Sequence, residues 1–224
     1  MITDFSMISD LFKELDKISS KNIRIFLIGG GALMKYRMKP YTKDIDIVVD
    51  SMGEFEELSR VLINAGFETQ IPGKEYERLA VSQIFIRGDF RIDLFFRYVC
   101  GKFYLSEGMK EHSTFEMKLE KLTLNVCSLG DILLFKSMTE RDGDLEDSWN
   151  IVKSDRITDW DAILDEARLQ SSGENSVWIT WITDRLELLA ERGAKIPILD
   201  EMRALSDEYI NEWERGLLER NKDM

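Results

Sequence analysis

The sequence predicts an α+β protein, in which a part containing a sheet is followed by a helical C-terminal part. Short apolar or alternating runs, typical of strands, are interspersed with amphipathic segments before residue 127. Beyond that residue the apolar positions recur at helical spacing. We therefore expect one domain over residues 1–127 and a helical domain over residues 128–224.

The first elements are expected in the order helix, strand, glycine turn, helix. Apolar residues recur every three or four positions from about Ser6 to Ser19, which indicates an amphipathic helix. A β-branched strand over Ile23–Ile28 then stops at Gly29-Gly30-Gly31. Residues Ala32–Tyr36 favour a second helix, which Pro40 closes.

The next strand places two carboxylates on one face. Apolar residues at 45, 47 and 49 alternate with Asp44, Asp46 and Val48, as a half-buried strand requires. Ser51 and Glu54 then form a capping box, and the helix that it begins runs to Gly66.

Two hairpins follow. The strands Ser82–Ile86 and Phe90–Phe96 are joined by a Gly-Asp turn, and Asp93 lies on the polar face of the second strand. Residues Phe115–Leu119 and Leu122–Val126 form a second hairpin with a weaker register signal, because charges crowd its first arm.

The remainder is expected to be helical. Ser128 and Asp131 form a second capping box. The expected helices cover Ile132–Met138, Leu145–Lys153, Trp160–Leu169, Val177–Glu191 and Leu199–Leu218. The last few residues are polar and are expected to fray.

The excess of acidic residues limits which partners the protein can bind. Acidic residues outnumber basic ones 42 to 30 in the 224-residue chain, and the net charge is -12. A surface of this charge repels polyanions, so any contact with nucleic acid must be local. The sequence shows neither a leader peptide nor an apolar run long enough for a membrane helix, so we expect a soluble cytoplasmic protein.

Few residues are available for nucleophilic or zinc chemistry. Cys100 and Cys127 are the only cysteines and His112 is the only histidine. A disulfide framework, a cysteine-rich zinc site and a multi-histidine metal site are therefore excluded. We expect His112 in an exposed loop or at a strand edge, which leaves carboxylates and lysines as the chemical groups.

Asp44 and Asp46 are the first candidates for metal ligands. Residues two apart on a strand lie about 7 Å apart on one face, and their charges repel when both carboxylates are ionised. A divalent cation relieves this repulsion, and Asp93 would supply a third oxygen ligand from an adjacent strand. The alternative is an ordinary solvated sheet face, which the Asp-Ile-Asp tripeptide alone would favour.

The glycines upstream add a second candidate feature. A strand leading into Gly29, Gly30 and Gly31 and then a helix leaves backbone amides open to a phosphate group. The alternative for the glycines alone is a tight turn.

Taken in order, these motifs resemble a known family. The strings IGGGAL, TKDIDIVV and RIDLFF are similar to the signature of the polymerase-β-like nucleotidyltransferase superfamily. The resemblance implies a small mixed sheet flanked by helices, with Gly29, Gly30 and Gly31 binding the triphosphate. It further implies that Asp44, Asp46 and Asp93 bind Mg²⁺, with two ions expected and Mn²⁺ as an alternative, and that Asp93 is a candidate base. Many relatives have a serine where this chain has Gly30, so a hydroxyl contact to phosphate is absent.

A second string, SLGDILLFKSMTERDGDLEDSW, resembles the helical segment of toxin-type nucleotidyltransferases, including the AbiEii group. This resemblance implies that Lys136 binds the triphosphate and that Asp144 is a polar catalytic residue, with Arg141 and Asp147 at the other matching positions. The alternative is a solvated lysine on a helix followed by an acidic turn.

The expected activity is transfer of a nucleoside monophosphate from a nucleoside triphosphate to an acceptor hydroxyl. Toxin-type relatives suggest RNA, particularly tRNA, as the acceptor. Lys35, Arg37, Lys39 and Lys43 are candidates for a local basic rim, and Lys43 is also a candidate nucleotide-binding residue. A small-molecule acceptor such as an aminoglycoside, or a protein hydroxyl, stays open.

The rival hypothesis is a non-catalytic or partner-regulated nucleotide-binding module, one half of a toxin and antitoxin pair. All five tryptophans lie in the helical part, where they either fill gaps between helices, which we favour, or anchor a protein partner. They are Trp149, Trp160, Trp178, Trp181 and Trp213.

Overall fold

The computed structural model describes residues 1–70, 83–99, 101, 103–139 and 141–220. The chain divides into two compact units, Met1–Phe135 and Lys136–Met224. The division falls within helix α6 (Leu129–Ser137), whereas the boundary expected from the sequence precedes that helix. Cys100, Ser82 and the C-terminal residues that we expected to fray lie outside the described residues.

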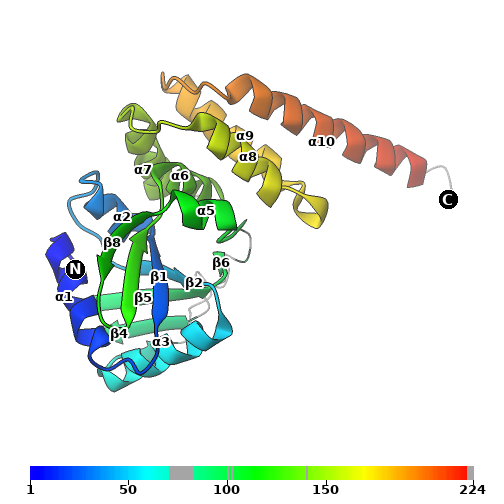
Figure 1. The fold of residues 1–224 in the computed structure, drawn as a ribbon. Helices are drawn as coiled ribbons and strands as arrows, with labels where there is room; N and C mark the ends of the chain where they lie inside the picture. Colours follow the sequence, from blue (N-terminus) through cyan, green and yellow to red (C-terminus); the bar gives the residue numbers. More distant parts are fainter. Residues whose placement is uncertain (71–82, 100, 102, 140, 221–224) are drawn as a thin grey trace. The chain divides into compact units, whose positions relative to one another are not determined.

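The first unit is built on a seven-stranded mixed sheet (Figure 1). Its strand order is β3-β4-β5-β2-β1-β9-β8. The strands are β1 (Ile23–Ile28), β2 (Ile45–Val49), β3 (Glu68–Gln70), β4 (Gln83–Arg87), β5 (Phe90–Phe96), β8 (Thr114–Lys118) and β9 (Leu122–Val126). The pairs β2–β5 and β1–β9 are parallel, and the other pairs are antiparallel. The mixed sheet confirms the predicted α+β class.

Both expected hairpins are present, as β4–β5 and β8–β9. The second has a register irregularity between Phe115 and Met117, in the arm where charged residues crowd the sequence. A separate small hairpin, β6 (Tyr98–Val99) with β7 (Phe103–Tyr104), was not expected, because two-residue strands leave no periodic signal.

Helices α1 (Phe5–Asp16) and α3 (Met52–Asn64) confirm two expected helices. The first ends earlier than expected, at Asp16, whose carboxylate accepts hydrogen bonds from the backbone amides that lead into β9. α3 begins with the predicted capping box of Ser51 and Glu54, and it packs on the central strands β1, β2 and β5.

Two expectations for this unit were wrong. The glycines do not form a turn before a helix; they are the first three residues of α2 (Gly29–Lys35). His112 is exposed, but it ends the short helix α5 (Glu107–His112) instead of lying in a loop or at a strand edge. The side-chain oxygen of Ser106 caps this helix, a signal that is visible in the sequence.

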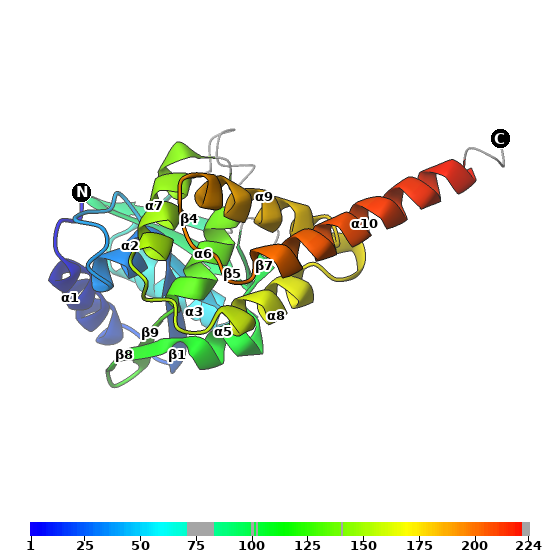
Figure 2. The same ribbon diagram turned by 90° about the horizontal axis from the view of Figure 1, so that it is seen from above.

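The second unit is helical, as expected. Its elements after α6 are α7 (Asp142–Lys153), α8 (Trp160–Gln170), the 3₁₀ turn η1 (Gly173–Asn175), α9 (Trp178–Glu191) and α10 (Leu199–Arg220). Helix α9 packs against α7, α8 and α10, and the C-terminal part of α10 extends beyond α8 and α9 (Figures 1 and 2). Helix α7 begins three residues before the expected Leu145, so Asp144 lies in its first turn instead of in a preceding acidic turn.

The tryptophans do not form the core of this unit. Aliphatic side chains of α8, α9 and α10, such as Ile163, Ile182 and Met202, are buried, whereas Trp213 is 53% exposed. The other four tryptophans are half-buried, and the rings of Trp178 and Trp181 meet edge to face. The core-packing interpretation is therefore wrong for Trp213, and the other four side chains are only partly buried.

None of the helices in the described part of the chain has the length and apolar character that crossing a membrane requires.

Candidate metal centre

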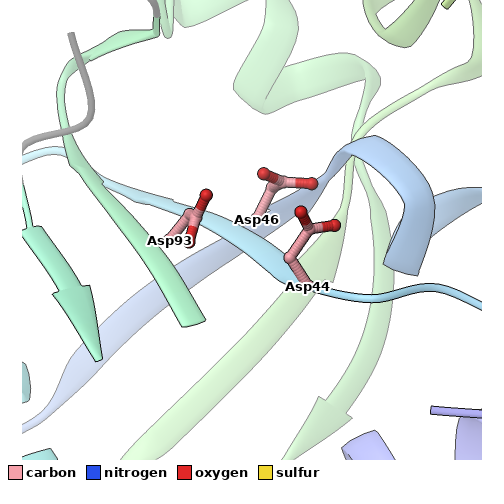
Figure 3. A group of neighbouring side chains, drawn as sticks. All are labelled: Asp44, Asp46 and Asp93. Atoms are coloured by element: carbon pink, nitrogen blue, oxygen red, sulfur yellow. The ribbon is translucent and has the colours of Figure 1, made fainter. Parts of the chain in front are cut away.

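Three aspartates converge on one side of the sheet. Asp46 and Asp93 are directly opposite each other in the parallel pair β2–β5, and Asp44 immediately precedes β2. Each carboxylate offers an oxygen within 4.8 Å of the others. Figure 3 shows the side chains of Asp46 and Asp93, from the two strands, and of Asp44, from the chain just before β2, gathered on one side. The structure therefore brings together the three carboxylates that the sequence singled out.

This spacing suits a divalent cation. Oxygen ligands of Mg²⁺ lie about 2.0–2.1 Å from the ion, so two ligands on opposite sides are about 4 Å apart. The carboxylate oxygens lie within 4.8 Å of one another, which is close to this separation. Because the donors are all carboxylate oxygens, they fit a hard cation and not a thiolate-seeking or imidazole-seeking one. The triad can thus hold a divalent metal ion.

Asp93 already has a cationic partner that sequence reasoning missed. Arg91 Nε donates to Asp93 Oδ1 at 2.7 Å, and Arg91 Nη2 donates to Oδ2 at 2.9 Å. The two residues are two positions apart on β5 and therefore share a face. The sequence shows that Arg91 and Asp93 lie on one face of the strand. The two hydrogen bonds between them depend on the rotamer of Arg91, which the sequence does not show.

Gly29 lies directly against Asp46. Its φ is +60°, a conformation that L side chains rarely adopt, and a Cβ added there would lie 2.1 Å from Asp46 Oδ2. Glycine at this position therefore leaves the space that the Asp46 carboxylate occupies.

Gly30 and Thr42 form a second close contact beside the triad. A Cβ on Gly30 would lie 2.3 Å from Thr42 Oγ1, and this hydroxyl donates a long hydrogen bond of 3.4 Å to Asp44 Oδ1. The backbone of Thr42 is held by an isolated bridge to Ile2. Sequence reasoning missed Thr42, because its contact depends on the chain returning from α2 past the glycines.

Two further candidate residues lie near these elements. Gly31 is buried in the first turn of α2, where an added Cβ would meet Leu27 and Ile8, so its immediate surroundings are apolar. Lys43 is exposed, in the segment between Thr42 and β2. The nucleotide-binding roles predicted for both stay predictions.

Lys136 lies in the second unit, in a buried ionic cluster. Its Nζ contacts Asp144 Oδ1 at 2.7 Å and Asp147 Oδ2 at 2.8 Å. Burial would lower the pKa of Lys136, but the two carboxylates outweigh it and raise that pKa. The solvated lysine of the alternative interpretation is thus wrong, because Lys136 is only 7% exposed.

Asp144 is the centre of this cluster. It also accepts hydrogen bonds from Thr139 Oγ1 at 2.5 Å and from Arg141 Nε at 2.7 Å. Burial alone would raise the pKa of Asp144, but the charges of Lys136 and Arg141 and the hydrogen bonds from Lys136 and Thr139 lower it to about 2. The arrangement is a satisfied ion-pair network, and the triphosphate-binding and catalytic roles stay predictions.

An open groove of about 690 Å³ runs past the end of α2 in the first unit. It is lined by residues 3–5 and by the C-terminal part of α2 with the loop that follows. Three of the four residues predicted to form a basic rim, Lys35, Arg37 and Lys39, line it. Lys35 is paired with Glu116 at 2.5 Å, and Arg37 has a φ of +59°, which is uncommon for a residue other than glycine.

No family model matches the sequence, and no curated protein matches it. A solved structure with a similar fold is the crystal structure of ANT(2")-Ia in complex with adenylyl-2"-tobramycin. The match has 12% identity and a TM-score of 0.48, and it covers 74% of this chain and 95% of that chain. A likeness of this degree does not establish a shared activity.

Proposed function

We propose that this protein is a metal-dependent nucleotidyltransferase, which moves a nucleoside monophosphate from a nucleoside triphosphate to an acceptor hydroxyl. The observation that carries the proposal is the convergence of Asp44, Asp46 and Asp93 beside Gly29 and Gly30. Three carboxylates on adjacent strands next to a backbone without side chains form a site for a cation and its phosphate ligand.

In the reaction, the acceptor oxygen forms a bond to the α-phosphorus, the bond from that phosphorus to the leaving pyrophosphate breaks, and the hydroxyl proton passes to a base. Bound Mg²⁺ would neutralise the charge that develops on the phosphate oxygens. Asp44 and Asp46 would hold the ion, and the backbone of Gly29 and Gly30 would contact the triphosphate. For Asp93 to act as the base, one of its oxygens must give up its contact with Arg91.

Calorimetry tests this proposal. The natural protein should bind a non-hydrolysable nucleoside triphosphate in the presence of Mg²⁺, and removal of Mg²⁺ should weaken binding by at least about tenfold, since the ion bridges carboxylates and phosphates. The double variant Asp44→Asn, Asp46→Asn should lose this Mg²⁺ dependence. Equal binding by both proteins would rule out the assignment, and Mg²⁺-dependent binding without transfer would favour the non-catalytic module.

RNA is the acceptor that we propose first. Support comes from the groove with Lys35, Arg37 and Lys39, whose charges can contact phosphates locally although the chain as a whole carries a charge of -12. The groove adjoins the glycines, because Lys39 Cδ would lie 3.8 Å from a Cβ on Gly30.

A cationic small molecule such as an aminoglycoside is the second candidate acceptor, and the net charge of -12 favours it. Incubation with labelled triphosphates, once with total RNA and once with an aminoglycoside, separates the two. Transfer into RNA should vanish after nuclease treatment, and Arg37→Gln should weaken it while leaving triphosphate binding unchanged. Label appearing only in the aminoglycoside would contradict an RNA acceptor.

A further inference from the structure

We propose that Arg91 competes with the divalent cation for Asp93 and thereby limits how tightly the free protein binds that cation. This inference rests on the proposed function, because it concerns the same three carboxylates. It assigns to Arg91 a positioning role at the metal centre.

The ion pair between Arg91 and Asp93 is close and largely sheltered from water. Both carboxylate oxygens accept an N–H, at 2.7 and 2.9 Å. The side chains are 19% exposed for Arg91 and 5% exposed for Asp93. A charge pair in such surroundings is weakly screened, so it acts more strongly than the surface pairs of the same chain.

The ion pair also stabilises the site when no metal ion is bound. Asp46 and Asp93 are opposite each other in the β2–β5 register, and Asp44 lies within reach of both. Three negative charges at this distance repel one another, and the guanidinium offsets one of them. Arg91 therefore stabilises the acidic cluster when no cation is bound.

A divalent ion held by the triad needs an oxygen of Asp93. Both oxygens face the two N–H donors of Arg91, so the ion either shares one oxygen with the guanidinium or displaces one of these hydrogen bonds. Either way, a unit positive charge lies a few ångströms from the ion and repels it. Removing the guanidinium while keeping Asp93 should therefore strengthen cation binding.

The test is a calorimetric titration of the full-length protein with Mn²⁺, without nucleotide. We expect Arg91→Gln to bind Mn²⁺ at least about tenfold more tightly than the natural protein. Arg91→Lys should fall in between, because an ammonium keeps the charge but cannot bridge both oxygens. In the absence of Mn²⁺, Arg91→Gln should have a lower Tm than the natural protein, and saturating Mn²⁺ should raise its Tm by more.

Arg87 offers a matched control on the neighbouring strand β4. It makes a similar two-point ion pair, with Glu14 at 2.5 and 2.8 Å. Because Glu14 is not part of the triad, Arg87→Gln should leave Mn²⁺ affinity unchanged.

Two results would overturn the proposal. Equal or weaker Mn²⁺ binding by Arg91→Gln would mean that the arginine supports the ion instead of competing with it. If that variant does not fold, Arg91→Lys decides in the same way, with equal or weaker binding as the contradicting result. Absence of Mn²⁺ binding by both the natural protein and Arg91→Gln would overturn the proposed metal site together with this inference, so the two failures are distinguishable.

Discussion

At the scale of single residues, the geometry of the triad depends on neighbouring glycines, which contribute no functional group. The Asp46 carboxylate occupies the space where any side chain at position 29 would begin. Gly29 combines this contact with a left-handed backbone, so two separate physical reasons favour glycine there. At position 30 the reason is the close approach of the Thr42 side chain.

Gly29→Ala should therefore disturb the metal centre directly. The new Cβ must displace the Asp46 carboxylate, and the positive φ adds backbone strain, so we expect a loss of about 1–3 kcal/mol in unfolding free energy. Mn²⁺ affinity measured by calorimetry should fall by at least about tenfold, since one of the three ligands moves.

Gly53→Ala is the control for this change. Gly53 lies in the first turn of α3, and nothing lies within 4 Å of an added Cβ. Alanine there should leave Mn²⁺ binding unchanged and raise stability slightly, by up to about 1 kcal/mol. If both variants bind Mn²⁺ as the natural protein does, Gly29 does not shape the site.

At the scale of elements, the parallel pair β2–β5 assembles the triad. Its register places Asp46 opposite Asp93. The strands themselves were predicted from alternation, but nothing in their sequences says that they are neighbours or that they run parallel, because pairing is a non-local choice. In the order β4-β5-β2-β1, α3 packs on β1, β2 and β5.

Helix α3 is fixed to the turn before β1 by a buried carboxylate. Glu57 Oε1 accepts hydrogen bonds from the Ser20 amide at 2.7 Å and from Arg60 Nη2 at 2.7 Å. The hydrogen bonds from Arg60 lower the pKa of Glu57, and those from Ser20 lower it further. Together they outweigh burial, which would raise the pKa, so it stays well below its usual range.

Glu57→Gln should destabilise the first unit by about 1–3 kcal/mol, because the charge that pairs with Arg60 is lost and a buried amide replaces it. Urea denaturation followed by circular dichroism measures this. Glu56→Gln is the matched control, since Glu56 is exposed on the same helix and should change stability by less than about 0.5 kcal/mol. Equal stabilities of the two variants would contradict the structural role of Glu57.

At the scale of the whole molecule, both units contain carboxylates that are stabilised in the ionised form. Glu57 belongs to the first unit and Asp144 to the second. A carboxyl group with a lowered pKa in the folded state stabilises the protein above its unfolded pKa, near 4, and this contribution is lost as the pH falls toward the folded value.

The second unit should therefore lose stability between about pH 4 and pH 2. The pKa of Asp144 falls from an ordinary value of 3.8 to about 2, so its contribution is about 2 kcal/mol. All five tryptophans lie at position 149 or later, so tryptophan fluorescence during urea denaturation follows this unit alone.

Asp144→Asn should lower the free energy of unfolding at neutral pH and reduce its dependence on pH, both measured by tryptophan fluorescence during urea denaturation. Asp142→Asn, at the exposed start of the same helix, should keep the natural dependence. An unchanged slope in Asp144→Asn would contradict the assignment of acid sensitivity to this cluster.

The sequence by itself determined the α+β class, the principal strands and helices, and which aspartates are candidates, because periodicity and capping are local properties of the chain. Only the tertiary structure decided that β2 and β5 are parallel neighbours, that Arg91 engages both oxygens of Asp93, and that Thr42 approaches Asp44. It also decided that Lys136 is buried between two carboxylates. These features depend on strand pairing, rotamers and burial, which are set by contacts between residues far apart in the sequence or by side-chain packing that a sequence pattern does not encode.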